Sequence, residues 1–274
     1  MNADHVVCAL TIAGSDSGGG AGIQADLKTF AAHGVHGLSA LAALTAQNTR
    51  GVRAVHVPPA AFLQEQIDAC FDDFAIGAVK IGMLANAAAV HAVADALERH
   101  RPPHVVVDPV MVATSGARLF DADALDALRT RLLPLASLLT PNIPEAEALL
   151  GHAIADDATA DAAADALLAL GAAAVLLKGG HLPGGDAMTD RYTDGTTRVN
   201  FRHPRLSIHA HGTGCTLASA VAANLCKGVT LLKACEAATD YVHGALLHAY
   251  RPGDPDIAVL DHFWRHTHAS PHDH

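Results

Sequence analysis

The chain has 274 residues, of which 50% are hydrophobic and only 17% are charged. This length and composition exclude a disordered chain and allow one large α/β domain with a full hydrophobic core. There are 28 acidic and 18 basic side chains, and the basic ones form no cluster. The resulting formal net charge of −10 argues against a nucleic-acid partner.

Short apolar runs alternate with helical stretches from the N-terminal end of the chain. Val6–Ala13 predicts a buried strand, because this run is too short to span a membrane. A glycine-rich loop separates it from a helix predicted over Ile23–His33. Leu38–Leu44 is compatible with a strand or a helix, whereas Val52–Val57 predicts a short strand before an amphipathic helix over Ala60–Phe71.

Four later apolar runs, each next to an Ala/Leu-rich helical stretch, predict further buried strands: Ala78–Ile81, His104–Val107, Ser137–Leu139 and Ala174–Leu177. The alternation of strands and helices predicts a mostly parallel sheet that is covered by helices on both faces. In such sheets, ligands bind beyond the carboxyl ends of the strands. Polar and glycine-rich residues follow the apolar runs of this chain, so we expect the functional site at that edge.

The Asp194-Gly195 turn predicts a hairpin between Met188–Tyr192 and Thr197–Phe201. No internal repeat or linker divides the chain, so we predict a single domain over residues 1–265. Residues 266–274 form a histidine-rich tail, which we predict to be disordered and to bind metal only opportunistically.

The first glycine-rich loop runs from Gly14 to Asp26 and contains Gly-x-Gly-x-x-Ala from Gly20 onward. A dinucleotide site would need an acidic residue about 20 positions later. No Asp or Glu occurs between Asp26 and Glu65, and no Gly-Lys-Ser/Thr sequence indicates a P-loop. The loop is therefore either a backbone-lined wall for a flat ligand or a turn without a ligand.

Polar side chains follow several of the predicted strands. Gln47 offers an acceptor and donors for the edge of a heterocycle, but taken alone this segment favours a surface turn. Asp108 comes directly after a buried strand, and Lys178 ends another, where it is placed to pair with a phosphate. Asn142 and Glu145 begin a helix, where they can bind Mg²⁺ through its water shell or act as an N-cap and a first-turn acid.

The segment from His211 to Thr216 places two glycines and Cys215 at the start of an Ala-rich helix. The first turn of a helix leaves N–H groups without partners at the positive end of the dipole, which makes an anion site. The same field predicts a lowered pKa for the Cys215 thiol. A tight turn with a buried cysteine is the alternative.

The chain has five cysteines, with no C-x-x-C pair and no zinc-like spacing. This odd number, without a signal peptide, is typical of reduced thiols in a cytoplasmic protein. Of the five, Cys215 is the one whose surroundings predict chemistry.

Seven segments carry a shared pattern in chain order: Gly14–Asp26, Gln47–Thr49, Lys80–Leu84, Asp108–Met111, Thr140–Glu145, Lys178–His181 and His211–Thr216. Together they resemble the hydroxymethylpyrimidine/phosphomethylpyrimidine kinases of thiamine biosynthesis, within the ribokinase-like superfamily. The resemblance extends from residue 7 to residue 265. It implies a ribokinase-like three-layer α/β/α sandwich with a mostly parallel central sheet and a small β flap.

The resemblance also implies an ATP- and Mg²⁺-dependent kinase with two successive phosphoryl transfers. The first acts on the hydroxymethyl group of 4-amino-5-hydroxymethyl-2-methylpyrimidine, and the second extends the monophosphate to the diphosphate. By the same likeness Cys215 is the catalytic base, and Gly212, Thr213 and Gly214 supply the anion hole.

The pyrimidine pocket that the resemblance implies is lined by Gly22, Asp26, Gln47, Met83 and Val110. A pyridoxal or pyridoxine kinase of the same superfamily is the closest alternative, since its substrate is also a flat heterocycle with a hydroxymethyl group. Gln47 and Met83 favour the pyrimidine. A non-catalytic sensor that binds the pyrimidine is the alternative from another class, and the retained base argues against it.

The resemblance further assigns ATP and metal contacts. Lys178 and Asn142 would contact ATP, and Glu145 with Asp108 would hold hydrated Mg²⁺. The expected partners are the small-molecule pyrimidine and ATP, without a nucleic acid or a membrane. We also expect a homodimer, in which the strand over Val52–Val57 or the predicted hairpin pairs with a second subunit.

Overall fold

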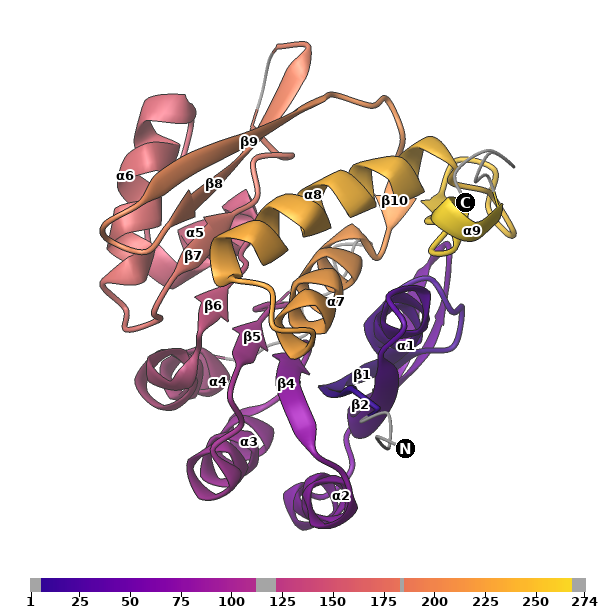
Figure 1. Ribbon diagram of the computed structural model, residues 1–274, viewed down its shortest axis with the longest axis vertical. Helices are drawn as coiled ribbons and strands as arrows, with labels where there is room; N and C mark the ends of the chain where they lie inside the picture. The colour runs from indigo at the N-terminus through magenta and orange to yellow at the C-terminus, as the bar shows by residue number, and fades with distance from the viewer. Residues whose placement is uncertain (1–5, 112–121, 183–184, 268–274) are drawn as a thin grey trace, which may run out of the picture.

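A central sheet organises the computed structural model, which describes residues 6–111, 122–182 and 185–267. Within these residues the sheet has nine strands in the order β3-β2-β1-β4-β5-β6-β7-β8-β9 (Figure 1). The six strands from β2 to β7 in this order are parallel, while β3, β8 and β9 are antiparallel to their neighbours. The strands are β1 (Cys8–Asp16), β2 (His36–Asn48), β3 (Gly51–His56), β4 (Ile76–Ile81), β5 (Val105–Val107), β6 (Leu138–Leu139), β7 (Val175–Leu177), β8 (Ala187–Thr193) and β9 (Arg198–Pro204).

Helices cover both faces of this sheet (Figure 1). One layer consists of α1 (Gly22–Ala32), α7 (Thr213–Cys226) and α8 (Leu231–Leu247). The opposite layer consists of α2 (Ala60–Asp73), α3 (Ala87–His100), α4 (Ala122–Ala127), α5 (Ile143–Leu150) and α6 (Asp157–Leu168). A π-helical turn (Leu128–Leu132) and a 3-10 turn (Leu133–Leu135) follow α4. The remaining elements are the two-stranded sheet of β10 (Ala210–His211) and β11 (Ala258–Val259), and α9 (Trp264–Thr267).

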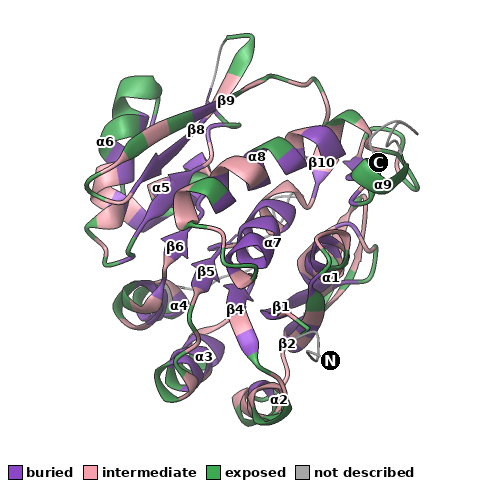
Figure 2. Cartoon of the chain, in the orientation of Figure 1, coloured by how far each residue is buried: buried purple, intermediate pink, exposed green. Residues whose placement is uncertain are grey.

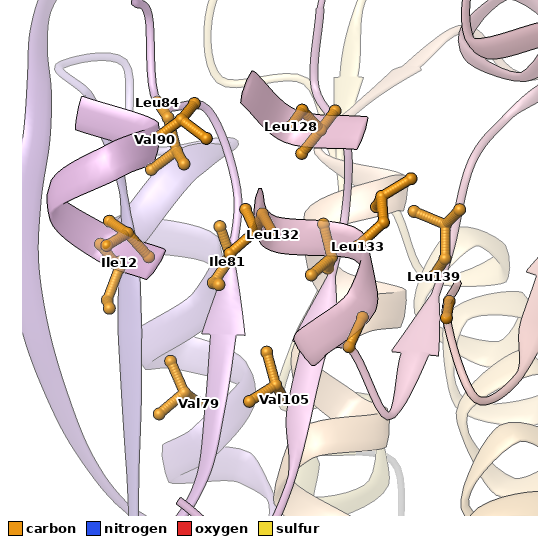
Figure 3. Close-up of a cluster of buried hydrophobic side chains, with 14 of the residues drawn as sticks. Ile12, Val79, Ile81, Leu84, Val90, Val105, Leu128, Leu132, Leu133 and Leu139 are labelled. Atoms are coloured by element: carbon orange, nitrogen blue, oxygen red, sulfur yellow. The ribbon is translucent and has the colours of Figure 1, made fainter. Parts of the chain in front are cut away.

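The alternation of side chains along the strands separates the two cores. Ala9 and Ala78 face the layer of α7, while their neighbours Leu10 and Val79 face the layer of α3. Small alanines let α7 approach the sheet closely, and every residue from Thr216 to Leu225 is buried (Figure 2). The opposite core is filled by larger branched side chains (Figure 3). The sequence explains this arrangement, since a helix that is apolar all round belongs in an interior.

The predicted α/β/α sandwich is confirmed, as are the strands and the Asp194-Gly195 hairpin, whose two strands are β8 and β9. Leu38–Leu44, which the pattern left open, lies within the long strand β2. No helix among the described residues is long and apolar enough to cross a membrane. The predicted tail lies mostly outside the described residues, and the single-domain boundary stays a prediction.

Candidate active site

The N-termini of α1 and α7 meet beyond the carboxyl ends of the parallel strands, where the two helices lie side by side (Figure 1). Gly212 has a φ of 85° and Gly22 a φ of 56°, a region that favours glycine. A Cβ atom on Gly212 would overlap the Gly20 carbonyl oxygen, and one on Gly22 would overlap the Gly14 carbonyl oxygen. The two glycine-rich segments are therefore fitted to one another as well as to their own turns.

The segment predicted to bind an anion forms the first turn of α7, and we call residues 212–215 the anion turn. Gly212 is the N-cap and brings no side-chain cap, and residues 212–215 are partly exposed. The N–H groups of this turn lie at the positive end of the helix dipole. The site can therefore bind a phosphate through the backbone of Thr213, Gly214 and Cys215.

Cys215 lies in this turn with its sulfur close to α1, where the Gly22 N–H donates to it. Burial raises the pKa of the Cys215 thiol to about 11, although Lys80 acts in the opposite direction. The prediction of a lowered pKa is therefore wrong. The desolvation of the sulfur outweighs the favourable effects of the Lys80 ammonium and of the Gly22 N–H on the thiolate.

A second cluster joins the ends of β5, β7 and α5. The Lys178 ammonium donates to Asp108 Oδ1 at 2.8 Å and lies 3.8 Å from Glu145 Oε2. A Cβ atom on Gly214 would lie 2.8 Å from Lys178 Nζ and 3.3 Å from Asp108 Oδ2. We call these three residues the Asp108–Lys178–Glu145 cluster. The cluster thus lies next to the anion turn, at Gly214.

The charges of this cluster shift two pKa values. Burial disfavours the Lys178 ammonium, but Asp108 and Glu145 outweigh burial and raise the Lys178 pKa to about 12. Burial also raises the pKa of Glu145 to about 7, with the Asp108 carboxylate adding to the effect and Lys178 opposing it. The cluster holds two carboxyl groups against one ammonium, so it has a negative net charge when both carboxyl groups are ionised.

Asn142 and Glu145 form a capping box at the start of α5. Glu145 Oε2 accepts the Asn142 N–H at 2.8 Å, and Asn142 Oδ1 accepts the Glu145 N–H at 2.9 Å. The N-cap role that the sequence left open is therefore present. No group of three or more His, Cys, Asp or Glu side chains is placed to hold a metal directly in the described ranges. The oxygen atoms of Asp108 and Glu145 suit Mg²⁺ that keeps part of its water shell.

Gln47 lies close to the anion turn, in β2 and not in a surface turn, and contacts the residue that precedes Gly212. Its Nε2 lies 2.8 Å from His211 Nε2, and Thr45 donates to its Oε1 at 3.1 Å. His211 Nε2 is also 3.2 Å from Asp16 Oδ2, and Asp16 accepts backbone N–H groups of the first glycine-rich loop. Asp16 was assigned no role from the sequence. Its position shortly after the predicted strand Val6–Ala13 was the signal that could have identified it as a site residue.

The resemblance implies that Asp26 lines the pyrimidine pocket, but this residue is not exposed at the surface of the site. Its carboxylate is fully buried and accepts from Lys80, Thr11 and Ser219. Lys80 was also missed, and its ammonium is equally buried. We therefore correct the expected contact of Asp26 with the pyrimidine: this residue supports the site from beneath.

Met83 lies beside the first glycine-rich loop, and Val110 lies next to Asp108. Met83 is buried, and a Cβ atom on Gly14 would lie 3.3 Å from its Cε. Val110 is half-buried, and its N–H donates to the Asp108 carbonyl oxygen at 2.8 Å. Met83 thus packs on the first glycine-rich loop, while Val110 is held next to the acidic cluster.

The sheet order, the helical layers and the anion turn define a ribokinase-like kinase. The family model described as phosphomethylpyrimidine kinase matches residues 16–259, and the chain belongs to this family. It is 53% identical over 245 residues to the hydroxymethylpyrimidine/phosphomethylpyrimidine kinase of Rhizobium meliloti, covering 89% of this chain and 91% of that protein.

Two further relatives extend the comparison. The chain is 53% identical over 238 residues to the thiamine biosynthesis bifunctional protein of Geobacter sulfurreducens, covering 86% of this chain and 48% of that longer protein. The structure of pyridoxal kinase from Staphylococcus aureus in complex with AMP-PCP and pyridoxal matches with a TM-score of 0.86 at 31% identity. That match covers 94% of each chain. Pyridoxal kinases, the alternative class, are therefore structural relatives of this chain.

Proposed function

We propose that this protein is an ATP-dependent kinase of thiamine biosynthesis, as its family and relatives support. It phosphorylates 4-amino-5-hydroxymethyl-2-methylpyrimidine and then converts the monophosphate to the diphosphate. The observation that carries the proposal is the partly exposed Cys215 in the first turn of α7, adjoining the Asp108–Lys178–Glu145 cluster. A base, an anion site and a phosphate-pairing lysine thus converge at one sheet edge.

In the first transfer, the substrate hydroxyl oxygen attacks the γ-phosphorus of ATP while the bond to the bridging oxygen breaks and ADP leaves. This reaction needs in-line positioning and charge stabilisation more than covalent chemistry from the protein. The backbone N–H groups of residues 213–215 stabilise the transferring phosphoryl group, and Lys178 pairs with the ATP phosphates. The base that accepts the proton of the hydroxyl is the Cys215 thiolate, the minor form near neutral pH of a side chain whose pKa is raised to about 11.

We propose that Asp108 and Glu145 hold Mg²⁺ through water and that Asn142 lies beside the ATP phosphates. When bound, the ion neutralises phosphate charge. The cluster suits this role because its two carboxyl groups exceed the charge of Lys178. We further propose that Gly22, Gln47, Met83 and Val110 border the heterocycle, with the Gln47 amide reading its polar edge.

The test is ADP formation by the purified protein with Mg-ATP and, separately, the pyrimidine, its monophosphate or pyridoxal. We expect turnover with both pyrimidines and a higher kcat/KM for the pyrimidine than for pyridoxal. A strong preference for pyridoxal would support the pyridoxal kinase alternative instead. Binding of the pyrimidine without any ADP formation would support the sensor.

We also propose a homodimer that forms through the edge of the sheet at β3. The last four residues of β3 are exposed, and Val55 among them is 42% exposed. Leu44 in the adjacent strand β2 is 40% exposed. An edge strand with exposed apolar side chains is suited to pair with a second copy of the chain. Light scattering after gel filtration should give twice the chain mass, and Val55→Lys should reduce it to the monomer mass.

A further inference from the structure

A fully buried ion pair lies beneath the anion turn and takes no part in the proposed contacts with ATP or pyrimidine. Lys80 Nζ donates to Asp26 Oδ2 at 2.9 Å, and both side chains are 0% exposed. Thr11 donates to the same oxygen at 2.6 Å, and Ser219 donates to Asp26 Oδ1 at 2.7 Å. A buried ion pair is weak evidence of a contribution to stability, because desolvation offsets the attraction between the charges. Its position therefore calls for another explanation.

The packing of α1 on α7 places this pair next to Cys215. Residues four apart on a helix lie on the same face, as do Gly22 and Asp26 on α1 and Cys215 and Ser219 on α7. The Gly22 N–H donates to the Cys215 sulfur, and one turn later Asp26 accepts from Ser219. These two contacts fix the register of the helices and hold the sulfur one turn from the carboxylate that Lys80 binds.

We propose that the Lys80–Asp26 pair sets how readily Cys215 loses its proton, with the ammonium favouring the thiolate and the carboxylate opposing it. Lys80 and Asp26 are positioning residues, since burial keeps both away from any ligand. Charges act over several ångströms in a desolvated site, so neither needs to touch the sulfur. The role of this proton in catalysis rests on the proposed function, whereas the coupling of charges does not.

Two other charged groups face Cys215, from two further elements. Asp108 follows β5 and disfavours the thiolate, while Lys178 follows β7 and interacts favourably with it. Both lie in the cluster proposed to bind ATP and Mg²⁺, so ligands would change their influence. Lys80 lowers the Cys215 pKa and Asp26 raises it, in agreement with the geometry. The buried pair is thus the part of the electrostatic environment that ligands leave constant.

The test compares Lys80→Met, Asp26→Asn and the double variant in the full chain without nucleotide. Alkylation of Cys215 by iodoacetamide is followed between pH 7 and pH 10 on its own peptide by mass spectrometry. The thiolate is the reacting form, so a shift of one pKa unit changes the rate about tenfold below the pKa. We expect slower alkylation in Lys80→Met, faster alkylation in Asp26→Asn and a rate near that of the parent chain in the double variant.

Opposite shifts are the outcome that a merely structural role does not produce. Loosened packing would expose the sulfur and speed alkylation in both single variants, and that result, or no shift in either, overturns the proposal. Cys70 on α2 is a half-buried thiol whose alkylation serves as an internal control. If Lys80→Met does not fold, the rate ratio between Asp26→Asn and the double variant decides, and a ratio of one rejects the coupling. Failure of kinase activity on every substrate would leave these rates unaffected.

Discussion

Two lysine–carboxylate pairs lie at the carboxyl edge of the sheet, and they differ in their access to solvent. The Lys80–Asp26 pair has a distance of 2.9 Å and no exposed side-chain area. The Lys178–Asp108 pair has a distance of 2.8 Å, but Lys178 is 14% exposed and a second carboxylate, Glu145, lies nearby. The same chemistry thus gives a fixed, neutral pair in one place and an accessible cluster with surplus negative charge in the other.

This difference separates two tasks that a phosphoryl-transfer site requires. An accessible lysine can exchange a protein carboxylate for a phosphate, and its carboxylates can then hold a hydrated cation. A sealed pair cannot exchange partners, so it supplies a constant field to Cys215 and a constant register between α1 and α7. Cys215 interacts electrostatically with both pairs, and removing its sulfur is therefore the most severe test of the comparison.

Cys215→Ala should lower kcat by about 10²–10⁴-fold, the range expected when a general base is lost. Binding of the pyrimidine should change little, because the residues that border the proposed pocket remain. Steady-state kinetics and calorimetric titration with the pyrimidine measure the two effects. A variant that retains kcat would show that the sulfur only fills space, and a parallel loss of binding would place it in the pocket.

Lys80→Met should destabilise the protein by about 3–5 kcal/mol, because it leaves the Asp26 carboxylate buried without its counter-ion. Lys178→Met should destabilise it less at pH 7, since Glu145 has a pKa of about 7 and can take up a proton in compensation. Urea unfolding of both variants measures the difference. The double variant Lys80→Met with Asp26→Asn is the control and should recover part of the loss. Equal losses in the two single variants would contradict the distinction between sealed and accessible pairs.

The sequence predicted the accessible cluster better than the sealed pair, for a physical reason. Asp108 and Lys178 directly follow buried strands, and parallel strands bring such residues to one edge. The burial of Asp26 depends instead on α1, α7 and β4 packing together, which no local pattern encodes. The same packing desolvates Cys215, so the helix field alone predicted the wrong direction for its pKa. The apolar run that indicates a strand ends at Leu44, so the sequence favours a turn at Gln47. Pairing with β3 extends β2 beyond this run and places Gln47 in the strand.

The pH dependence of the free energy of unfolding should distinguish the accessible cluster from the sealed pair. This is the smallest of the expected effects, but it is specific to Glu145. The pKa of Glu145 in the folded chain, about 7, lies above its ordinary value of 4.5. The folded chain therefore binds more protons than the unfolded chain between these pH values, and stability falls as pH rises through this window. In the parent chain, the free energy of unfolding should fall by on the order of 2–3 kcal/mol as the pH rises through this window, because one pKa unit corresponds to about 1.4 kcal/mol. We expect Glu145→Gln to remove this fall.

Urea unfolding at pH 5, 6 and 7 measures this slope, with Glu65→Gln on the exposed face of α2 as the matched control. The control should keep the slope of the parent chain. An unchanged slope in Glu145→Gln would show that the carboxylate is already compensated by Lys178. The cluster would then carry no surplus charge and would not attract a cation. Addition of Mg²⁺ should stabilise the parent chain more at pH 7 than at pH 5, because the cation binds the ionised form of Glu145.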